Sequence, residues 1–266
     1  MLDYLKKAPF IGAFFFVSLL SVQSSQASES DTERLCQAHK YDELATLEKV
    51  YDGDTIKLTD GRKVRLIAIN TPEMGHSQRL EQAYAAEARD SLKKLFIKNR
   101  KVKLKWGKDK KDRFSRLLAH VFTEDDQNVA AQLIRRGLGY AIVVPPNEWQ
   151  MDCYFSLEQE AKRASRGIWN HPNYLPKDPG KLSPENTGFQ VIEGEVTGIG
   201  RGKKTIWLDM GTGFALRVNR KHLQNFTETP ILELKGKRVR VRGWVSFYND
   251  KLRMSLKHSY MLTVLD

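Results

Sequence analysis

The sequence has few of the features that mark membrane proteins, zinc proteins or P-loop nucleotide-binding proteins. Its apolar run at residues 9–20 is shorter than the about 20 residues that a membrane span needs. It contains no glycine-rich phosphate loop and no internal repeat, and its six histidines have no metal-ligand spacing. These absences argue against a zinc site, a P-loop and a repeat architecture.

Acidic residues are also in deficit. The 266 residues include 44 Lys and Arg against 32 Asp and Glu, which gives a formal net charge of +12. With 41% hydrophobic residues the chain can still build a core. The excess of basic residues favours a polyanionic partner, such as nucleic acid, an anionic membrane or an acidic polysaccharide. A generally basic exported protein without such a partner is the alternative.

The N-terminal residues predict export. Lys6 and Lys7 precede the apolar run, and Ser25-Gln26-Ala27 has the small-x-small pattern of a signal-peptidase site. We therefore expect a signal peptide over residues 1–27 and a periplasmic or secreted protein without a stable membrane anchor. An uncleaved anchor is the alternative.

Export changes the interpretation of the two cysteines, Cys36 and Cys153. In an oxidising compartment two cysteines most simply form one disulfide. Two free, buried thiols are the alternative.

The hydrophobic pattern divides the chain into a domain at 28–170, a proline-rich linker at 171–188 and a basic β-domain at 189–266. The first domain is expected to be α+β and mainly β, with hairpin turns at Asp52-Gly53-Asp54 and Asp60-Gly61. Further elements are predicted as follows: a helix at 79–98, strands at 101–106 and 115–122 around a charged loop at 107–113, a helix between Asn128 and Gly137, and a helix from Ser156 to Gly167.

The second domain is expected to be a small oligonucleotide-binding-like barrel. Basic residues alternate with apolar ones along 238–244, which places Arg240 and Arg242 on one face, and the basic strands of this domain carry interleaved aromatics such as Trp207 and Trp244. A basic groove with aromatic rings suits single-stranded nucleic acid, so Arg217, Arg240 and Arg242 are candidate contacts. A solvated strand face over a valine core is the alternative interpretation.

A group of polar residues in the first domain fits phosphodiester chemistry. Asp54 and the segment Asn70-Thr71 offer oxygen ligands to a hard divalent cation. Glu73 is placed to activate or orient a water. Arg65 and Arg116 have the guanidinium geometry that binds phosphate oxygens in pairs.

Six segments make the chain resemble the staphylococcal nuclease-like (thermonuclease) family. They are VYDGDTIKL (50–58), VRLIAINTPE (64–73), YAAEA (84–88), DRFSRLLAHVF (112–122), LIRRGLGYA (133–141) and EAKRASRGIW (160–169). The resemblance implies a five-stranded oligonucleotide-binding-type barrel with three helices, one calcium ion, and cleavage of DNA and RNA to products ending in 3′-phosphate. A similar β-domain is appended to some exported nucleases of this family.

By position, the resemblance makes Asp54, Asn70 and Thr71 the calcium ligands, and Arg65, Glu73 and Arg116 the catalytic residues. Asn70 stands where the best-known member has a second aspartate, so one ligand charge is lost and calcium affinity should fall. That member's base-stacking tyrosines would fall near Val143 and Pro145, so base stacking must come from Tyr140 or Phe114, or be weaker.

We therefore expect an exported, calcium-dependent endonuclease, monomeric, that acts on DNA and RNA with single strands favoured. Arg113 is a further candidate contact to nucleic acid. A catalytically weak nucleic-acid-binding protein that kept the fold is the first alternative, and a module that binds an acidic glycan or protein is the second.

Overall fold

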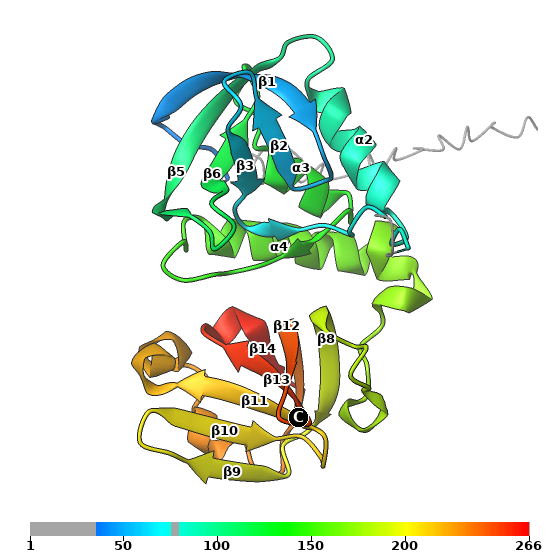
Figure 1. Ribbon diagram of the computed structural model, residues 1–266, viewed down its shortest axis with the longest axis vertical. Coiled ribbons are helices and arrows are strands. Elements are labelled where there is room, and N and C mark those ends of the chain that lie inside the picture. Colours follow the sequence, from blue (N-terminus) through cyan, green and yellow to red (C-terminus); the bar gives the residue numbers. More distant parts are fainter. Residues whose placement is uncertain (1–35, 76–79, 266) are drawn as a thin grey trace, which may run out of the picture.

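The computed structural model describes residues 36–75 and 80–265, so the predicted signal peptide lies outside the described residues. Two β-rich units lie one above the other along the long axis of the molecule (Figure 1). No helix in the described ranges is long and apolar enough to cross a membrane.

The first unit is a closed five-stranded barrel with three helices, as predicted. The barrel order is β1-β2-β3-β6-β5, and all neighbours are antiparallel except β3 and β6, which run parallel. Its elements are β1 (Glu43–Val50), β2 (Thr55–Leu58), β3 (Lys63–Leu66), β4 (Ile69–Asn70), α2 (Ala85–Leu95), β5 (Lys101–Lys111), β6 (Leu117–Phe122), α3 (Val129–Arg135), β7 (Tyr140–Ala141) and α4 (Met151–Arg163).

Local sequence explains several of these boundaries. The Asn128 side chain accepts a hydrogen bond from the Ala131 amide and starts α3, and Gly137 follows its end with φ +71°. Gly61 has φ +87° in the turn between β2 and β3, a conformation that glycine adopts without steric cost. These cap and turn predictions are confirmed.

Three boundary predictions are wrong. The helix expected from residue 79 begins at Ala85, because Tyr84 adopts a left-handed conformation (φ 66°); residue 79 itself lies outside the described ranges. The last helix begins at Met151, so Ser156 is an interior position and not a cap. The charged segment after Trp106 continues β5 to Lys111 instead of forming a loop.

The second unit repeats the strand order of the first. β8 and β9 are two parts of one strand, separated by two residues; β8 pairs with β12 and β9 with β10, and β11 runs parallel to β13. The predicted C-terminal β-domain is therefore present. Its strands are β8 (Gly188–Glu195), β9 (Gly198–Arg201), β10 (Thr205–Asp209), β11 (Phe214–Asn219), β12 (Arg238–Tyr248), β13 (Lys251–Leu256) and β14 (Leu262–Val264).

The segment between the units is packed against both of them. The Tyr174 hydroxyl donates to the Ala83 carbonyl in the first unit, and the Lys177 backbone pairs with β8 of the second. Short 3-10 turns at Pro172–Tyr174 and Pro179–Lys181 set its path. The proline-rich segment thus connects the units through defined contacts.

A buried ion pair joins the two units directly. Arg242 of β12 donates from Nη1 to both carboxylate oxygens of Glu158 of α4, at 2.6 and 2.8 Å. The Glu158 side chain is completely buried. Next to this pair, the Phe155 and Tyr260 rings stack at 4.2 Å, and the Tyr260 hydroxyl donates to Asp152.

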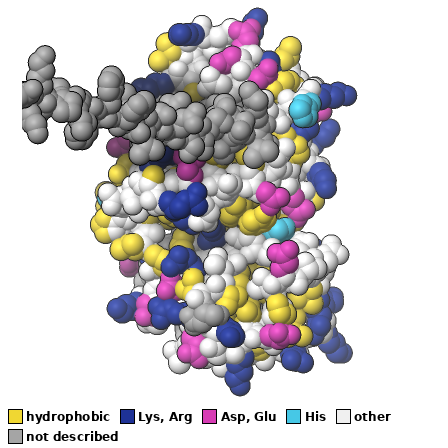
Figure 2. All heavy atoms as spheres, turned by 180° about the vertical axis from the view of Figure 1, so that it is seen from behind, with side chains coloured by type: hydrophobic (Ala, Val, Ile, Leu, Met, Phe, Trp, Pro, Cys, Tyr) yellow, Lys and Arg dark blue, Asp and Glu magenta, His cyan; other side chains and the backbone are white. Residues whose placement is uncertain are grey.

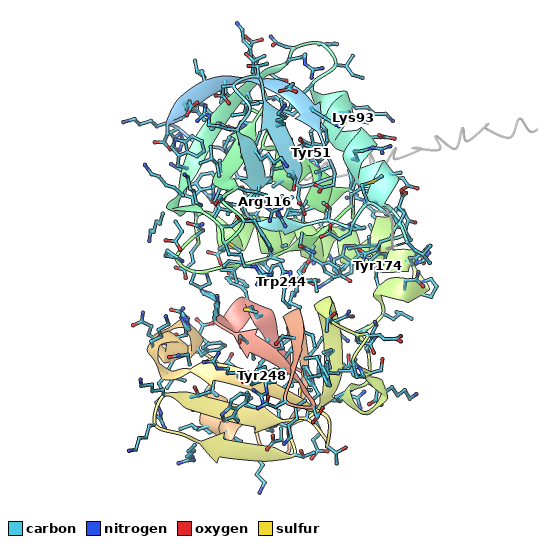
Figure 3. All side chains as sticks on the ribbon, viewed as in Figure 1. Tyr51, Lys93, Arg116, Tyr174, Trp244 and Tyr248 are labelled. Atoms are coloured by element: carbon cyan, nitrogen blue, oxygen red, sulfur yellow. A yellow bond between two sulfur atoms is a disulfide. The ribbon has the colours of Figure 1, made fainter. Side chains whose placement is uncertain are left out.

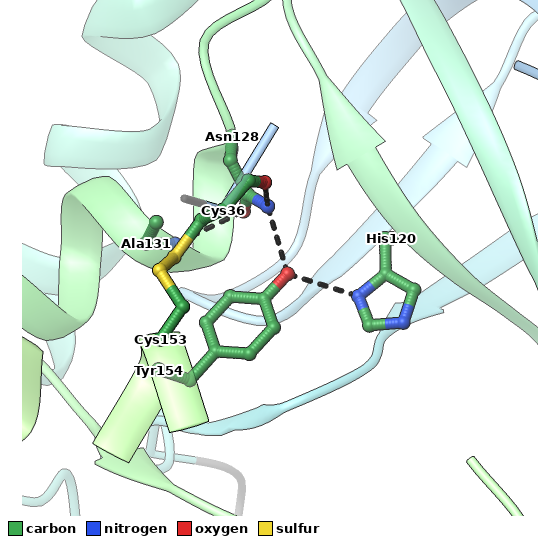
Figure 4. Close-up of a disulfide and its surroundings, with 6 residues drawn as sticks. All are labelled: Cys36, His120, Asn128, Ala131, Cys153 and Tyr154. Carbon is green, nitrogen blue, oxygen red and sulfur yellow. Dashed lines mark hydrogen bonds between the residues drawn. A yellow bond between two sulfur atoms is a disulfide. The ribbon is translucent and has the colours of Figure 1, made fainter. Parts of the chain in front are cut away.

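The predicted disulfide between Cys36 and Cys153 is present and ties the start of the described chain to α4. Beside it, the Tyr154 hydroxyl lies 2.7 Å from Asn128 Nδ2 and 3.0 Å from His120 Nδ1 (Figure 4). Burial lowers the pKa of His120 to about 3, so the ring is neutral in the folded protein.

Candidate active site

A groove of about 910 Å³ lies between the two units and is lined by residues from both. From the first unit it takes the predicted residues Asp54, Arg65, Asn70, Thr71, Glu73, Arg113 and Arg116. From the second unit it takes residues of β8 and of β12, including Phe189 and Trp244. In Figure 3, Arg116 lies in the lower half of the first unit and Trp244 at the upper end of the second. The structure therefore brings the predicted catalytic and metal residues to one site.

Asp54 is the centre of the cluster. It is buried, and its Oδ2 accepts hydrogen bonds from the Thr71 amide at 2.9 Å and the Thr71 hydroxyl at 3.2 Å. The 52–54 turn can approach Thr71 because Gly53 has no side chain: a Cβ there would stand 2.7 Å from Thr71 Cγ2. The hairpin thus holds one carboxylate rigidly against the end of β4.

Arg65 lies beneath this cluster and is also buried. Its Nη1 donates to the carbonyls of Leu66 and Ile69, at 2.6 and 2.8 Å. Its Nη2 lies 3.0 Å from Asp54 Oδ2 and 3.2 Å from Asn70 Oδ1. The guanidinium therefore fixes the two predicted ligand side chains relative to each other and supplies a fixed positive charge at the floor of the groove.

Arg116 comes to the same groove from the loop before β6. Its Nε donates to Asp112 at 2.7 Å, and its Nη1 lies 3.4 Å from the Thr55 hydroxyl. Burial raises the pKa of Asp112, but hydrogen bonds from Arg116 outweigh this and hold the pKa below its ordinary value. The guanidinium groups of Arg113 and Arg116 lie over the ring of Phe114, at 4.7 and 5.6 Å. Asp112 and Phe114 thus orient two arginines toward the groove.

Glu73 follows β4 and is exposed at the groove. Its backbone amide donates to Gln82 Oε1 at 2.9 Å, and its carbonyl accepts from the Gln82 amide at 3.0 Å. Burial and then the charge of Asp54 raise the pKa of nearby Asp52 to about 7, and the Glu73 charge adds to this shift. The site therefore concentrates carboxylates, which a cation would stabilise.

The donor chemistry fits a hard cation. Asp54 offers a carboxylate, Asn70 an amide oxygen and Thr71 a backbone carbonyl, which are the oxygen ligands that calcium accepts. Within the described residues, no group of three or more His, Cys, Asp or Glu side chains is arranged to hold a metal. Only one ligand here carries a charge, so water and substrate oxygens would have to complete the shell.

The other predicted contacts to nucleic acid lie away from the described lining of the groove. Arg217 is exposed on β11. Arg240 is committed to Glu193, with Nη2 to Oε2 at 2.7 Å, and Arg242 to the buried Glu158. The Arg242 side chain is 13% exposed. It therefore serves the contact between the units, and its role in binding nucleic acid remains an untested prediction.

On the rear face of the C-terminal unit, basic side chains are interrupted by acidic ones. Figure 2 shows Lys and Arg around the rim of the C-terminal unit with Asp and Glu between them. The groove is lined by Arg65, Arg113 and Arg116 together with carboxylates such as Asp54 and Glu73, so the placement of these charges is more informative than the net charge of the chain.

Among the aromatic residues that line the groove, sequence reasoning gave no site role to Phe189, Trp244 and Tyr174. Trp244 was recognised as an aromatic in a basic strand, but nothing in its local pattern indicated that its strand faces the first unit. Tyr140, predicted as an alternative stacking residue, lines the groove but is 6% exposed, because Trp169 and Phe189 pack against its ring.

The fold and site define a class: an oligonucleotide-binding-type barrel with a carboxylate, an amide and paired arginines at one end. The family profile described as staphylococcal nuclease homologue matches residues 63–171. The chain is 34% identical to the thermonuclease of Staphylococcus intermedius over 127 residues, which cover 46% of this chain and 74% of that protein. The chain belongs to the staphylococcal nuclease family.

Two relatives from Bacillus subtilis each match about half of the chain. The prophage-derived endonuclease YokF and the endonuclease YncB are each 36% identical over 135 residues, or 49% of this chain. The matches span 45% of the first protein and 63% of the second. The chain thus shares one region with these relatives and not their full length.

Proposed function

We propose that the protein is an exported, calcium-dependent endonuclease that hydrolyses DNA and RNA in the groove between its two units. One observation carries the proposal: both arginines, the buried aspartate and Glu73 line the same groove. The names of the relatives, thermonuclease and endonuclease, support the same reaction class.

In this proposal Arg65 and Arg116 bind the phosphodiester that is cut. Charge accumulates on the phosphoryl oxygens as phosphorus becomes five-coordinate, and preoriented guanidinium groups stabilise that charge. Arg65 is held by backbone carbonyls and Arg116 by Asp112, so little reorganisation is needed when substrate binds.

Glu73 accepts a proton from the attacking water. The new bond joins the water oxygen to phosphorus, and the bond from phosphorus to the 5′ oxygen breaks. The 5′ oxygen leaves as an alcohol with a proton from solvent, and the phosphate stays on the 3′ oxygen. Asp54, Asn70 and Thr71 would hold calcium, which when bound supplies positive charge beside the phosphate.

The test is a cleavage time course with calcium or with EDTA. Glu73→Gln should reduce the rate at least about a hundredfold, because general base catalysis contributes about 10²–10⁴. Glu185→Gln is the matched control, since Glu185 also lines the groove and the change removes the same charge. Equal rates for the two variants would contradict the role of Glu73.

A second candidate function is binding without cleavage, favoured by Asn70, which leaves a single charged ligand at the site. It predicts uncut DNA under all conditions and binding that weakens steeply with salt. Arg116→Lys separates the two, because it keeps the charge for binding but loses the paired hydrogen bonds that the cleavage proposal requires.

A further inference from the structure

Trp244 is an exposed aromatic side chain on the wall of the groove that faces the catalytic residues. It is 43% exposed, lies on β12 and lines the same groove as Arg65, Glu73 and Arg116. A large ring left in water beside arginines indicates a surface that binds a flat, anionic ligand.

The position of Trp244 follows from the docking of the two units. Side chains alternate along β12, so Trp244 lies on the same face as Arg242, two residues earlier. Because Arg242 binds Glu158 of the first unit, this face of β12 is turned toward the first unit. The ion pair thereby directs the next residue of that face, Trp244, into the groove. Figure 3 shows Trp244 at the end of the second unit that faces the first.

The Trp244 ring is supported by an aromatic neighbour in a T-shaped contact. Its cross-strand neighbour is Phe189, whose ring meets it edge-on, at 5.2 Å between centroids and 77° between planes. Phe189 is packed in turn against Tyr140 of the first unit at 5.0 Å. An edge contact orders the tryptophan while leaving a π-face for a ligand.

In the first unit the exposed ring at the groove is Phe114, which is 65% exposed but already has two arginines over it. The resemblance would place the stacking tyrosines at Val143 and Pro145. Neither residue belongs to the described lining of the groove, and Val143 is only 3% exposed. Tyr140 is buried, and the two arginines over the Phe114 ring are Arg113 and Arg116. Arginines on one wall and Trp244 on the other would therefore hold different parts of a nucleotide.

We propose that Trp244, supported by Phe189, stacks on an unpaired nucleobase of the strand whose phosphate lies at Arg65 and Arg116, so that the second unit completes the substrate site. A base in a duplex is already stacked on both faces, so this contact selects single-stranded nucleic acid. The inference rests on the proposed function, because it places the phosphate at the candidate catalytic residues.

The test compares Trp244→Leu with Phe247→Leu in the full chain. Phe247 is the matched control: it lies on the same strand with the same 43% exposure but is absent from the described lining of the groove. Binding of a labelled single strand and of its duplex is measured by fluorescence polarisation in EDTA, so that cleavage is not required. Trp244→Leu should bind the single strand about tenfold more weakly and the duplex unchanged, whereas Phe247→Leu should leave both unchanged. Trp244→Phe should retain most of the affinity.

Abasic substitutions identify the base itself. Replacing one nucleotide at a time in the single strand should weaken wild-type binding at one position, and the same abasic site should have no effect on Trp244→Leu. Equal affinities for Trp244→Leu and Phe247→Leu would overturn the inference even if the wild type cleaves DNA. A wild type that cleaves nothing while Trp244→Leu alone loses single-strand binding would refute the endonuclease and leave the stacking contact standing.

Discussion

Arg242→Ala would leave the fully buried Glu158 with one cationic partner, Lys162, in place of two. Removing one member of a buried ion pair costs about 3–5 kcal/mol, because the remaining charge is left without compensation. Lys162 Nζ stays 3.0 Å from Glu158 Oε2, so we expect the lower value, about 3 kcal/mol. Given about 2–4 °C per kcal/mol for a chain of this size, the melting temperature should fall by about 6–12 °C.

The matched control is Arg238→Ala on the same strand. Arg238 is 58% exposed and shares Glu193 with Arg240, so its loss should cost less than about 1 kcal/mol. Urea unfolding measures both variants. Hydrogen exchange of the Ala141 amide, which donates to Glu158 at 3.0 Å, should quicken only in Arg242→Ala.

The double variant Arg242→Met with Glu158→Gln tests the electrostatic explanation. Neutralising both partners removes the stranded charge, so the double variant should be more stable than Arg242→Ala. If Arg242→Ala and Arg238→Ala lose the same free energy of unfolding, the buried pair does not join the two units and our reasoning about the groove fails with it.

Three further predictions concern other parts of the chain. Replacing Cys36 and Cys153 with serine should lower the free energy of unfolding by up to about 5 kcal/mol, because the disulfide closes a loop with a sequence separation of 117 residues. Urea unfolding measures the change, and a loss below about 1 kcal/mol would contradict the prediction. Asn70→Asp should lower the calcium concentration for half-maximal activity about tenfold, because it adds a negative charge to the ligand set. Calorimetry with calcium alone measures the affinity, and an unchanged affinity would show that residue 70 is not a calcium ligand. His120 should make the protein acid-sensitive: its folded pKa is lowered to about 3, so between pH 6.5 and 3 the unfolded state binds more protons and stability falls as pH falls. From pH 7 to 4.5 the wild type should lose about 2.5 kcal/mol more than His120→Gln, and equal losses would contradict the neutral, buried histidine.

The sequence predicted the local parts of the site because their determinants are local. Gly53 and Gly61 mark turns, and Asn128 marks a helix cap. Asp54, Arg65, Asn70 and Glu73 come close together because they lie on one hairpin and around the short strand that follows it. Parallel pairing of β3 with β6 then brings Arg116 close, which only the family resemblance could indicate. Predictions failed where two local signals competed: Ser156 has the residue type of a cap, but the helix already begins at Met151.

The part of the groove formed by the second unit could not be predicted from local sequence patterns. Alternating Arg and Val along β12 indicates a half-buried strand, and the pattern is the same whether the arginines meet water or a buried carboxylate. Glu158 is equally uninformative, because a glutamate four residues before a lysine on a helix usually forms an exposed pair. The pairing of Arg242 with Glu158 became visible only when both units were placed in space.

That pairing connects the fold of the second unit to the chemistry of the first. Glu158 accepts from the Ala141 amide of β7, and β7 pairs with β4, in which Asn70 lies opposite Tyr140. Arg242 also donates to the Ala141 carbonyl, at 3.2 Å. One arginine of the second unit thus supports the strand that carries a candidate metal ligand and orients the face that carries Trp244. Removing the second unit should therefore affect both substrate binding and the calcium site, whereas a tethered, independent binding module would affect binding alone.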